Sequence, residues 1–218
     1  MKKFNEIFKE HTGESILKWS NYGDIYDKHF TPYREHNINI LEIGVLKGGS
    51  MRIWEKYFPK ANIFGIDINK ECLQYQSDRT KIFIGDQSDV SFLRNVKAKI
   101  PRIDILIDDG SHRAKDQKVT FDEMYYHVTK PGVYLIEDIE LNYWLDKDKD
   151  NPDNFMAYMK NKIDELNIRR TMNRKISESY PFKDTEVRFN NSTNSISFYE
   201  NMVVLEKQEM PKAKEIKR

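Results

Sequence analysis

The stretch INILEIGVLKGGS (38–50) joins an apolar run, residues 38–44, to a glycine-rich loop. An apolar run of this length is typical of a strand that is buried on both faces of a sheet. Similar runs recur along the chain, separated by segments of helical spacing: NIFGID (62–67), KIFIGD (81–86), IDILIDD (103–109) and VYLIED (133–138). This alternation predicts parallel strands joined by helical crossovers, which form a doubly wound, Rossmann-like α/β sheet.

The chain after this sheet is predicted to add a helix and a hairpin. A charged stretch at 145–154 precedes a helical pattern that runs to about Asn167. We expect an antiparallel hairpin at the end, made of TEVRF (185–189) and SISFYENMVVLEK (195–207) around the turn-forming NNSTN. The predicted fold class is therefore mostly parallel α/β with a C-terminal antiparallel hairpin.

Two helices are predicted from the spacing of apolar residues. The first has one aromatic side, made of Trp19, Tyr22, Tyr26, His29 and Phe30. Two interpretations of it stay open: a helix that packs on the sheet, or a lid that folds over a ligand at the sheet edge. The second helix is expected to stop at Pro131-Gly132, and its apolar face consists of Phe121, Met124, Tyr125 and Val128.

Composition excludes several classes of function. The 218 residues include 36 Lys and Arg against 35 Asp and Glu, so the formal net charge is only +1. This balance gives no field that would attract nucleic acid or an anionic membrane. No apolar run reaches the roughly 20 residues that span a bilayer, and the charged start is unlike a signal peptide, so we expect a cytoplasmic protein. Cys72 is the only cysteine, which excludes an internal disulfide and a thiolate zinc cluster.

Acidic residues close most of the predicted strands. The first run leads into the glycine loop, and the later runs end in Asp67, Asp86, Asp108-Asp109 and Glu137-Asp138. Ligands bind at the carboxyl ends of the strands of an open parallel sheet, because the loops diverge there and helix N-termini point their amides outward. One such acid is often only a helix cap. Several at one edge would repel each other, which favours a polyhydroxyl or cationic ligand.

The glycine loop favours S-adenosylmethionine over a dinucleotide. The dinucleotide fingerprint G-x-G-x-x-G needs a second glycine where the backbone approaches a pyrophosphate, and this chain has Leu46 at that position. S-adenosylmethionine has no phosphate, so tight turns at Gly44 and at Gly48 or Gly49 are enough for its aminoacyl group. Asp67 is spaced to bind ribose hydroxyls in either cofactor, so it does not discriminate between them.

A second group of residues suits a divalent cation. IDDGSH (107–112) and IED (136–138) would place Asp109, Glu137 and Asp138 on two neighbouring loops with His112 beside them. Three carboxylates without a thiolate suit magnesium or manganese rather than zinc. The alternative is purely structural, with a turn at Asp109, a helix cap at Glu137-Asp138 and a surface imidazole.

Several of these segments together resemble a known family: LEIGVLKGGSMRIWEKYFP (41–59), FGIDI (64–68), IGDQSD (84–89), IDDGSH (107–112) and PGVYLIEDIELNYW (131–144). Over residues 15–144 the chain is similar, in order and spacing, to the metal-dependent class I methyltransferases that act on sugar hydroxyls. These are the macrolide deoxysugar O-methyltransferases. The resemblance implies S-adenosylmethionine and Mg²⁺ (or Mn²⁺) as cofactors, and a small saccharide or glycoside as the methyl acceptor.

The resemblance also implies roles for particular residues. Asp109, Glu137 and Asp138 would bind the metal, and His112 would be the general base that deprotonates a metal-chelated hydroxyl. The cofactor site would consist of residues at successive strand ends: Glu42, Gly44, Gly48, Gly49, Ser50, Asp67, Ile68, Asp86, Gln87 and Asp108.

We expect one domain over residues 1–210 with three special segments. They are an N-terminal helical lid at 1–35, an insertion on the acceptor side at 145–180, and a flexible tail at 211–218. Assembly into a homo-oligomer is left open.

Three other functions also stay open. A catechol-type acceptor would chelate magnesium through vicinal phenolic oxygens in the same way as a sugar. A nicotinamide-dependent sugar oxidoreductase would share the sheet and Asp67, but it should have a better glycine fingerprint and a Tyr-x-x-x-Lys base. A non-catalytic S-adenosylmethionine-binding protein would bind the cofactor without metal-dependent turnover.

Overall fold

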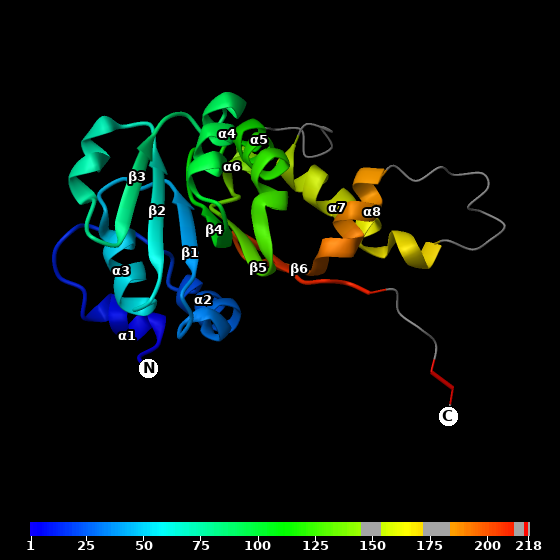
Figure 1. Cartoon of the computed structure of the whole chain (residues 1–218), viewed down its shortest axis with the longest axis horizontal. Helices are drawn as coiled ribbons and strands as arrows, with labels where there is room; N and C mark the ends of the chain where they lie inside the picture. The colour runs from blue at the N-terminus through cyan, green and yellow to red at the C-terminus, as the bar shows by residue number, and fades with distance from the viewer. Residues whose placement is uncertain (145–153, 172–183, 212–215, 218) are drawn as a thin grey trace.

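Among the residues that the structure describes, seven strands form one sheet through the centre of the molecule (Figure 1). The structure is a computed structural model, and it describes residues 1–144, 154–171, 184–211 and 216–217. The strand order is β3-β2-β1-β4-β5-β7-β6. The strands are β1 (Asn39–Ile43), β2 (Asn62–Asp67), β3 (Thr80–Ile84), β4 (Ile103–Asp108), β5 (Val128–Glu137), β6 (Thr193–Tyr199) and β7 (Met202–Lys207). The first five are parallel, and β7 is antiparallel to both β5 and β6, which confirms the predicted fold class.

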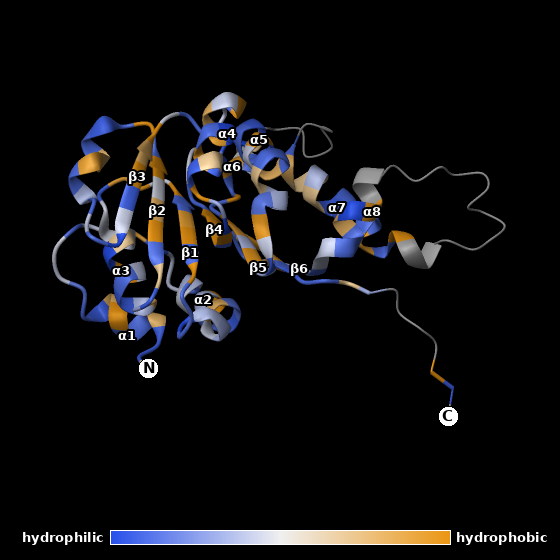
Figure 2. Cartoon of the chain, viewed as in Figure 1, coloured by the Kyte–Doolittle hydropathy of each residue, from blue (hydrophilic) through white to orange (hydrophobic). Residues whose placement is uncertain are grey.

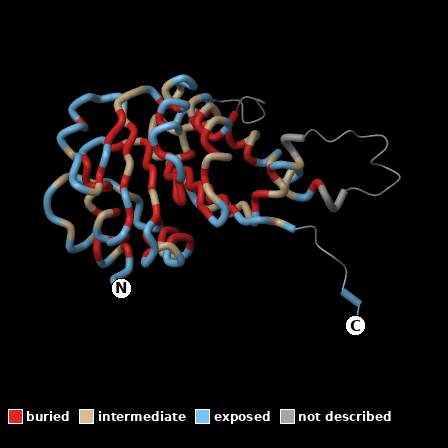
Figure 3. Tube along the Cα trace, viewed as in Figure 1, coloured by how far each residue is buried: buried red, intermediate tan, exposed pale blue. Residues whose placement is uncertain are grey.

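Helices cover both faces of this sheet. One face carries α1 (Phe4–Lys9), α2 (Tyr22–Phe30) and α3 (Gly49–Tyr57), and the other carries α4 (Val90–Lys99), α5 (Ala114–Met124), α7 (Phe155–Thr171) and α8 (Asp184–Ser192). The remaining elements are short: η1 (Thr31–Tyr33), η2 (Lys70–Tyr75), η3 (Tyr125–His127) and α6 (Leu141–Trp144). In β4, Ile105 and Ile107 face the first helical layer and Leu106 faces the second. Apolar residues are concentrated in the strands (Figure 2), and the same strands are buried (Figure 3).

The aromatic helix predicted near the start of the chain is α2, and it packs on the sheet. Tyr26 and Phe30 are fully buried, and their rings lie 5.1 and 5.9 Å from the Trp54 ring of α3. Trp19 was predicted on the same helix face, but it lies before the helix begins and its side chain is 59% exposed. The packing interpretation therefore holds for α2, and it does not extend to the residues that precede the helix.

The hairpin is present at the end of the chain, but its predicted first strand is wrong. Residues 185–189 belong to α8, and the hairpin pairs β6 with β7 across a turn at Glu200-Asn201. The segment NNSTN, which was predicted to form the turn, instead ends the helix. The hydroxyls of Ser192 and Thr193 donate to the carbonyls of Arg188 and Phe189 at 2.9 and 2.8 Å. Asn201 provides the actual turn, with a positive φ of 62° that asparagine tolerates.

A second boundary was also predicted wrongly. The helix that contains Phe121 ends at Met124, and Val128 already begins β5 rather than completing the helix face. Val128 pairs with Ile103 of β4, so cross-strand pairing extends β5 back through Pro131. By contrast, the predicted helix before Asn167 is confirmed as α7. Half of the predicted insertion at 145–180 and most of the tail at 211–218 lie outside the described residues.

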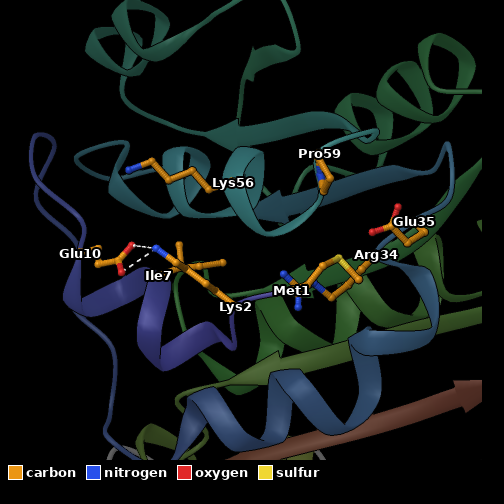
Figure 4. A pocket seen from close by; sticks show the side chains of 8 residues that line it. All are labelled: Met1, Lys2, Ile7, Glu10, Arg34, Glu35, Lys56 and Pro59. Carbon is orange, nitrogen blue, oxygen red and sulfur yellow. Dashed lines mark hydrogen bonds and ion pairs between the residues drawn. The ribbon is translucent and has the colours of Figure 1, made fainter.

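Two other observations bear on function. None of the helices in the described parts of the chain is long and apolar enough to cross a membrane. A hollow of about 400 Å³ lies near the amino ends of the strands, where Lys2 pairs with Glu10 and where Arg34 and Pro59 precede β1 and β2 (Figure 4). None of the predicted site residues lines this hollow. The candidate site must therefore be sought at the opposite, carboxyl edge of the sheet.

Candidate active site

The glycine loop lies between β1 and α3 and is packed tightly on two sides. Gly44 has a φ of +96°, and a Cβ atom there would lie 1.9 Å from the carbonyl oxygen of Asp109. Gly49 is equally restricted, because a Cβ atom would lie 2.5 Å from the carbonyl oxygen of Ser15. Glycine is thus required at both positions by close backbone approach. Gly44 also brings the glycine loop into direct contact with the loop that follows β4.

The segment that contacts Gly49 is residues 11–20, which we call the strap. It joins α1 to α2 without regular helix or strand and is the blue trace between them in Figure 1. Ile16 packs against the core, while Leu17 and Trp19 are exposed to solvent. The strap therefore lies across the start of α3, where the glycine loop ends.

Asp67 holds the glycine loop in place. Its Oδ2 accepts hydrogen bonds from the backbone amides of Val45 and Leu46, at 3.0 and 2.9 Å, and its Oδ1 accepts one from Asn69 at 2.8 Å. A carboxylate has about four lone-pair directions, so Asp67 retains one for a ligand hydroxyl. Leu46 and Ile68 flank this carboxylate, and each is 71% exposed. A ligand at this position would therefore meet two apolar side chains and one hydrogen-bond acceptor, the Asp67 carboxylate.

The predicted residues at the ends of β3 and β4 divide into one exposed and two buried groups. Asp86 is exposed, and the backbone amide of Ser88 lowers the pKa of its carboxyl. Gln87 is buried and bridges the two loops: its Nε2 donates to Asp108 at 3.1 Å and its Oε1 accepts from the Ser111 amide at 2.6 Å. Asp108 and Gln87 therefore fix the backbone that leads to Asp109 and His112.

Asp108 should make stability depend on pH, because burial raises the pKa of its carboxyl from 3.8 to about 7. Between these values the folded protein binds more protons than the unfolded chain, so the unfolding free energy falls as pH rises and levels off above about pH 7. Asp108→Asn cannot ionise. We expect the variant to gain about 1–4 kcal/mol of unfolding free energy relative to wild type between pH 4 and pH 8.

The measurement is urea unfolding across this pH range in EDTA, with the exposed Asp78→Asn as the control. Buried Glu42 also has its pKa raised to about 7 by burial, so some pH dependence should persist in Asp108→Asn. If the unfolding free energies of wild type and Asp108→Asn changed in parallel with pH, the raised pKa of Asp108 would be contradicted.

The structure brings together three of the four predicted metal and base residues, Asp109, His112 and Asp138. Asp109 Oδ1 and Asp138 Oδ2 lie 3.9 and 3.8 Å from His112 Nε2. Their nearest ligand atoms all fall within 4.8 Å of one another, and each of the three side chains is partly exposed. His112 and Asp138 both have positive φ, 58° and 51°, a backbone conformation that non-glycine residues adopt only where the surroundings impose it.

Glu137 lies on the buried side of the same group. Tyr26 donates a hydrogen bond to its Oε1 at 2.6 Å, and the Lys18 ammonium donates to its Oε2 at 2.7 Å. Burial raises the pKa of Glu137, and the charge of Lys18 opposes that shift. Buried Glu42 is nearby, with its Oε1 3.7 Å from Lys18 Nζ. We call Glu42, Asp109, Glu137 and Asp138 the acid cluster.

Sequence reasoning missed the contacts by which residues far from β4 and β5 in the sequence hold this cluster. Lys18, on the strap, also pairs with Asp109, and its side chain is only 4% exposed. Although burial opposes it, the two carboxylates hold the pKa of Lys18 above its ordinary value. Tyr22 and Asn201 donate to Asp138 Oδ1, at 2.6 and 3.1 Å. No local pattern indicates such contacts, because they join residues far apart in the sequence.

The acid cluster fits a divalent ion on the evidence of its own contacts. Its donors are hard carboxylate oxygens, which magnesium and manganese prefer. It already gathers around a positive charge, because Lys18 contacts Asp109 and Glu137 at once. Asp109 and Asp138 additionally present oxygens toward His112, on the exposed side.

A hollow of about 610 Å³ lies next to the acid cluster. Its lining includes Trp19 from the strap, Glu140 and Tyr143 from the end of β5 and the start of α6, and Asn201 from the hairpin turn. Asn201 connects the hollow to the acid cluster, because the same side chain donates to Asp138. The size suits a small-molecule site.

The sheet order and the carboxyl-edge site define a Rossmann-like methyltransferase fold, and comparison with solved structures agrees. The MycE methyltransferase of the mycinamycin pathway, in complex with Mg and SAH, superposes with a TM-score of 0.79 and 28% identity. The match covers 94% of this chain and 53% of that one. A second MycE complex, which also holds Mycinamycin VI, gives a TM-score of 0.76 and 27% identity over 95% and 54% of the two chains.

Curated proteins of similar sequence are sugar O-methyltransferases. The 8-demethyl-8-alpha-L-rhamnosyl tetracenomycin-C 2'-O-methyltransferase of Streptomyces olivaceus is 34% identical over 136 residues, which are 58% of this chain and 36% of that protein. The Mycinamicin VI 2''-O-methyltransferase of Micromonospora griseorubida is 37% identical over 126 residues, 55% and 31% of the two. No family model matches the chain. The resemblance is confirmed, and the aligned residues span about a third of the length of these relatives.

Proposed function

We propose that the chain catalyses S-adenosylmethionine-dependent and magnesium-dependent O-methylation of a sugar hydroxyl in a saccharide or glycosylated metabolite. The observation that carries the proposal is the contact between the glycine loop and the acid cluster, where Gly44 abuts the backbone of Asp109. This contact would bring a methyl donor and a metal-chelated acceptor to one place. The similarity to sugar O-methyltransferases supports the same assignment.

In this proposal the cofactor binds along the ends of β1 to β3. The turns at Gly44, Gly48 and Gly49, with Glu42 and Ser50 beside them, would hold the methionine part. Asp67 would bind the ribose through its remaining lone pair, with exposed Ile68 against the adenine. Asp86 would face the adenine side, while Gln87 and Asp108 support it from within.

The acceptor hydroxyl must lose its proton, because an alcohol is a poor nucleophile near neutral pH. Asp109, Glu137 and Asp138 would hold Mg²⁺, which when bound polarises neighbouring hydroxyls and makes one more acidic. His112 Nε2 faces this side of the cluster and would take the proton. The hydroxyl oxygen then forms a C–O bond to the methyl carbon as the C–S bond breaks, leaving S-adenosylhomocysteine.

The hollow beside Asp138 would bind the acceptor. Trp19 and Tyr143 are 59% and 53% exposed, and aromatic rings with polar neighbours suit a ligand that has both apolar faces and hydroxyls. A catechol would use the same metal, but the amide of Asn201 and the carboxylate of Glu140 favour a ligand with several hydroxyls.

Replacing Tyr143 with Ala should raise the KM for a saccharide acceptor about three- to tenfold, because a ring contact is worth about 0.5–1.5 kcal/mol. The affinity for S-adenosylmethionine should not change, since Tyr143 does not contact the glycine loop. Initial-rate kinetics would measure the effect, with Phe198→Ala on the edge strand β6 as an exposed aromatic control. An unchanged KM would place the acceptor elsewhere.

Calorimetry and a transfer assay test the proposal as a whole. We expect saturable binding of S-adenosylmethionine and no binding of NAD. Asp67→Ala should lose cofactor affinity by about 5- to 150-fold, since about 1–3 kcal/mol follows from unpaired buried partners. Methyl transfer to methyl α-L-rhamnopyranoside should exceed transfer to catechol. Binding of NAD alone would indicate an oxidoreductase, and cofactor binding without transfer to either acceptor would indicate a non-catalytic protein. The 1–210 domain, the 1–35 lid, a homo-oligomer and a cytoplasmic location stay predictions.

A further inference from the structure

Lys18 is the charged residue that the proposed reaction does not use, although it lies inside the proposed metal site. Its ammonium pairs with Asp109 and Glu137 and lies 3.7 Å from Glu42. Lysine is rarely buried to this extent unless it is paired with acids. The ammonium thus has the position and the partners of a bound cation.

The contacts of Glu137 show why Lys18 and a metal ion would compete. Both oxygens of Glu137 already have a partner, Tyr26 for Oε1 and Lys18 for Oε2. Lys18 also contacts Asp109 Oδ2, which leaves Oδ1 facing His112. A divalent ion that uses Glu137 and Asp109 as ligands would approach the oxygens that now face the ammonium. The repulsion between two cations at such close range would make the ion and Lys18 compete for this position.

We propose that Lys18 is a tethered cation that occupies the acid cluster until a divalent ion replaces it, and that this exchange releases the strap. The inference rests on the proposed function, because it takes the acid cluster as the metal site. The lysine neutralises buried carboxylates that would otherwise repel each other. The cluster therefore keeps a positive partner in both states, and the metal must displace an intramolecular competitor.

Release of the strap would affect both the proposed cofactor site and the proposed acceptor site. The carbonyls of Glu14 and Ser15 lie against Gly49, so the strap borders the cofactor loop. Trp19, the residue after Lys18, lines the hollow beside Asp138. Between these contacts Lys18 is the buried ionic anchor, since Leu17 and Trp19 on either side of it are exposed. Loading of the metal would therefore alter access to the methyl donor and to the acceptor together.

The test is calorimetric titration of the full chain with MgCl₂ and MnCl₂, for wild type, Lys18→Met and Lys18→Arg. We expect Lys18→Met to bind the ion at least about tenfold more tightly, since the competing charge is gone. Lys18→Arg retains a charge and should stay close to wild type. The control is Lys2→Met, which removes an exposed lysine paired with Glu10 and should change nothing.

A second measurement needs no substitution. Amide hydrogen exchange of the wild-type strap should become faster when Mg²⁺ is added, while exchange in β4 and β5 stays slow. The same Kd in wild type and Lys18→Met, or a strap whose exchange does not respond to Mg²⁺, would overturn the inference and leave the metal assignment intact. Failure of every form to bind the ion would contradict the metal assignment itself, and the inference with it.

Discussion

An Asp109→Asn protein is expected to lose methyl transfer by about a thousandfold or more while it still binds S-adenosylmethionine. Asp109 is the one carboxylate of the acid cluster that faces both Lys18 and His112. Its loss would remove a charged ligand from the proposed metal, whose stabilisation of developing charge amounts to several kcal/mol. The proposed direct contacts to the cofactor lie at the ends of β1 to β3, so calorimetry with S-adenosylmethionine should be unaffected.

The measurement is transfer of a labelled methyl group in magnesium buffer, with Asp24→Asn on the exposed surface of α2 as the control. Excess EDTA should lower methyl transfer by the wild-type protein as much as the Asp109→Asn substitution does, and added Mg²⁺ should restore it. Full activity of the wild type in excess chelator would refute the role of the metal.

Replacing His112 with Ala should lower turnover by about 10²–10⁴, the usual contribution of a positioned general base. The reason is geometric: the Nε2 atom of His112 lies 3.9 and 3.8 Å from the carboxylates of Asp109 and Asp138, which would hold the chelated acceptor. Uptake of Mg²⁺ should persist, which separates this variant from Asp109→Asn.

Single-turnover kinetics across pH 6–9 would isolate the chemical step from binding. His36→Ala, which changes an exposed imidazole before β1, is the matched control. Near-normal turnover of His112→Ala throughout this range would show that a group other than His112 removes the proton from the hydroxyl.

The sheet could be predicted closely because its information is local. Runs such as NIFGID and IDILID combine β-branched residues with burial on both faces, and the observed β2 and β4 coincide with them. The prediction was poorer where tertiary contacts decide the structure. Phe189 reads as part of a strand, but it lies in α8 and packs against Tyr125, 5.4 Å between ring centroids.

The candidate site could be predicted in outline for a topological reason. Parallel strands bring their last residues to one edge, so Asp109 and Asp138 had to lie near each other once β4 and β5 were neighbours. The partners of these acids could not be predicted, because Lys18 and Asn201 come from opposite ends of the chain. Their side chains reach the cluster only after the sheet and its covering segments have assembled.

The position of β7 has a consequence for how the chain is made on the ribosome. β7 lies inside the sheet, between β5 and β6, yet among the described strands it is the last in sequence and so the last of them to be synthesised. Until it emerges, the nascent protein exposes the apolar edge of β5, which is a template for pairing with other chains. Asn201 arrives in the same hairpin and secures Asp138. We therefore expect the emerging polypeptide to depend on a chaperone until β7 inserts, which pairs the edge of β5 and brings Asn201 to Asp138 in one event.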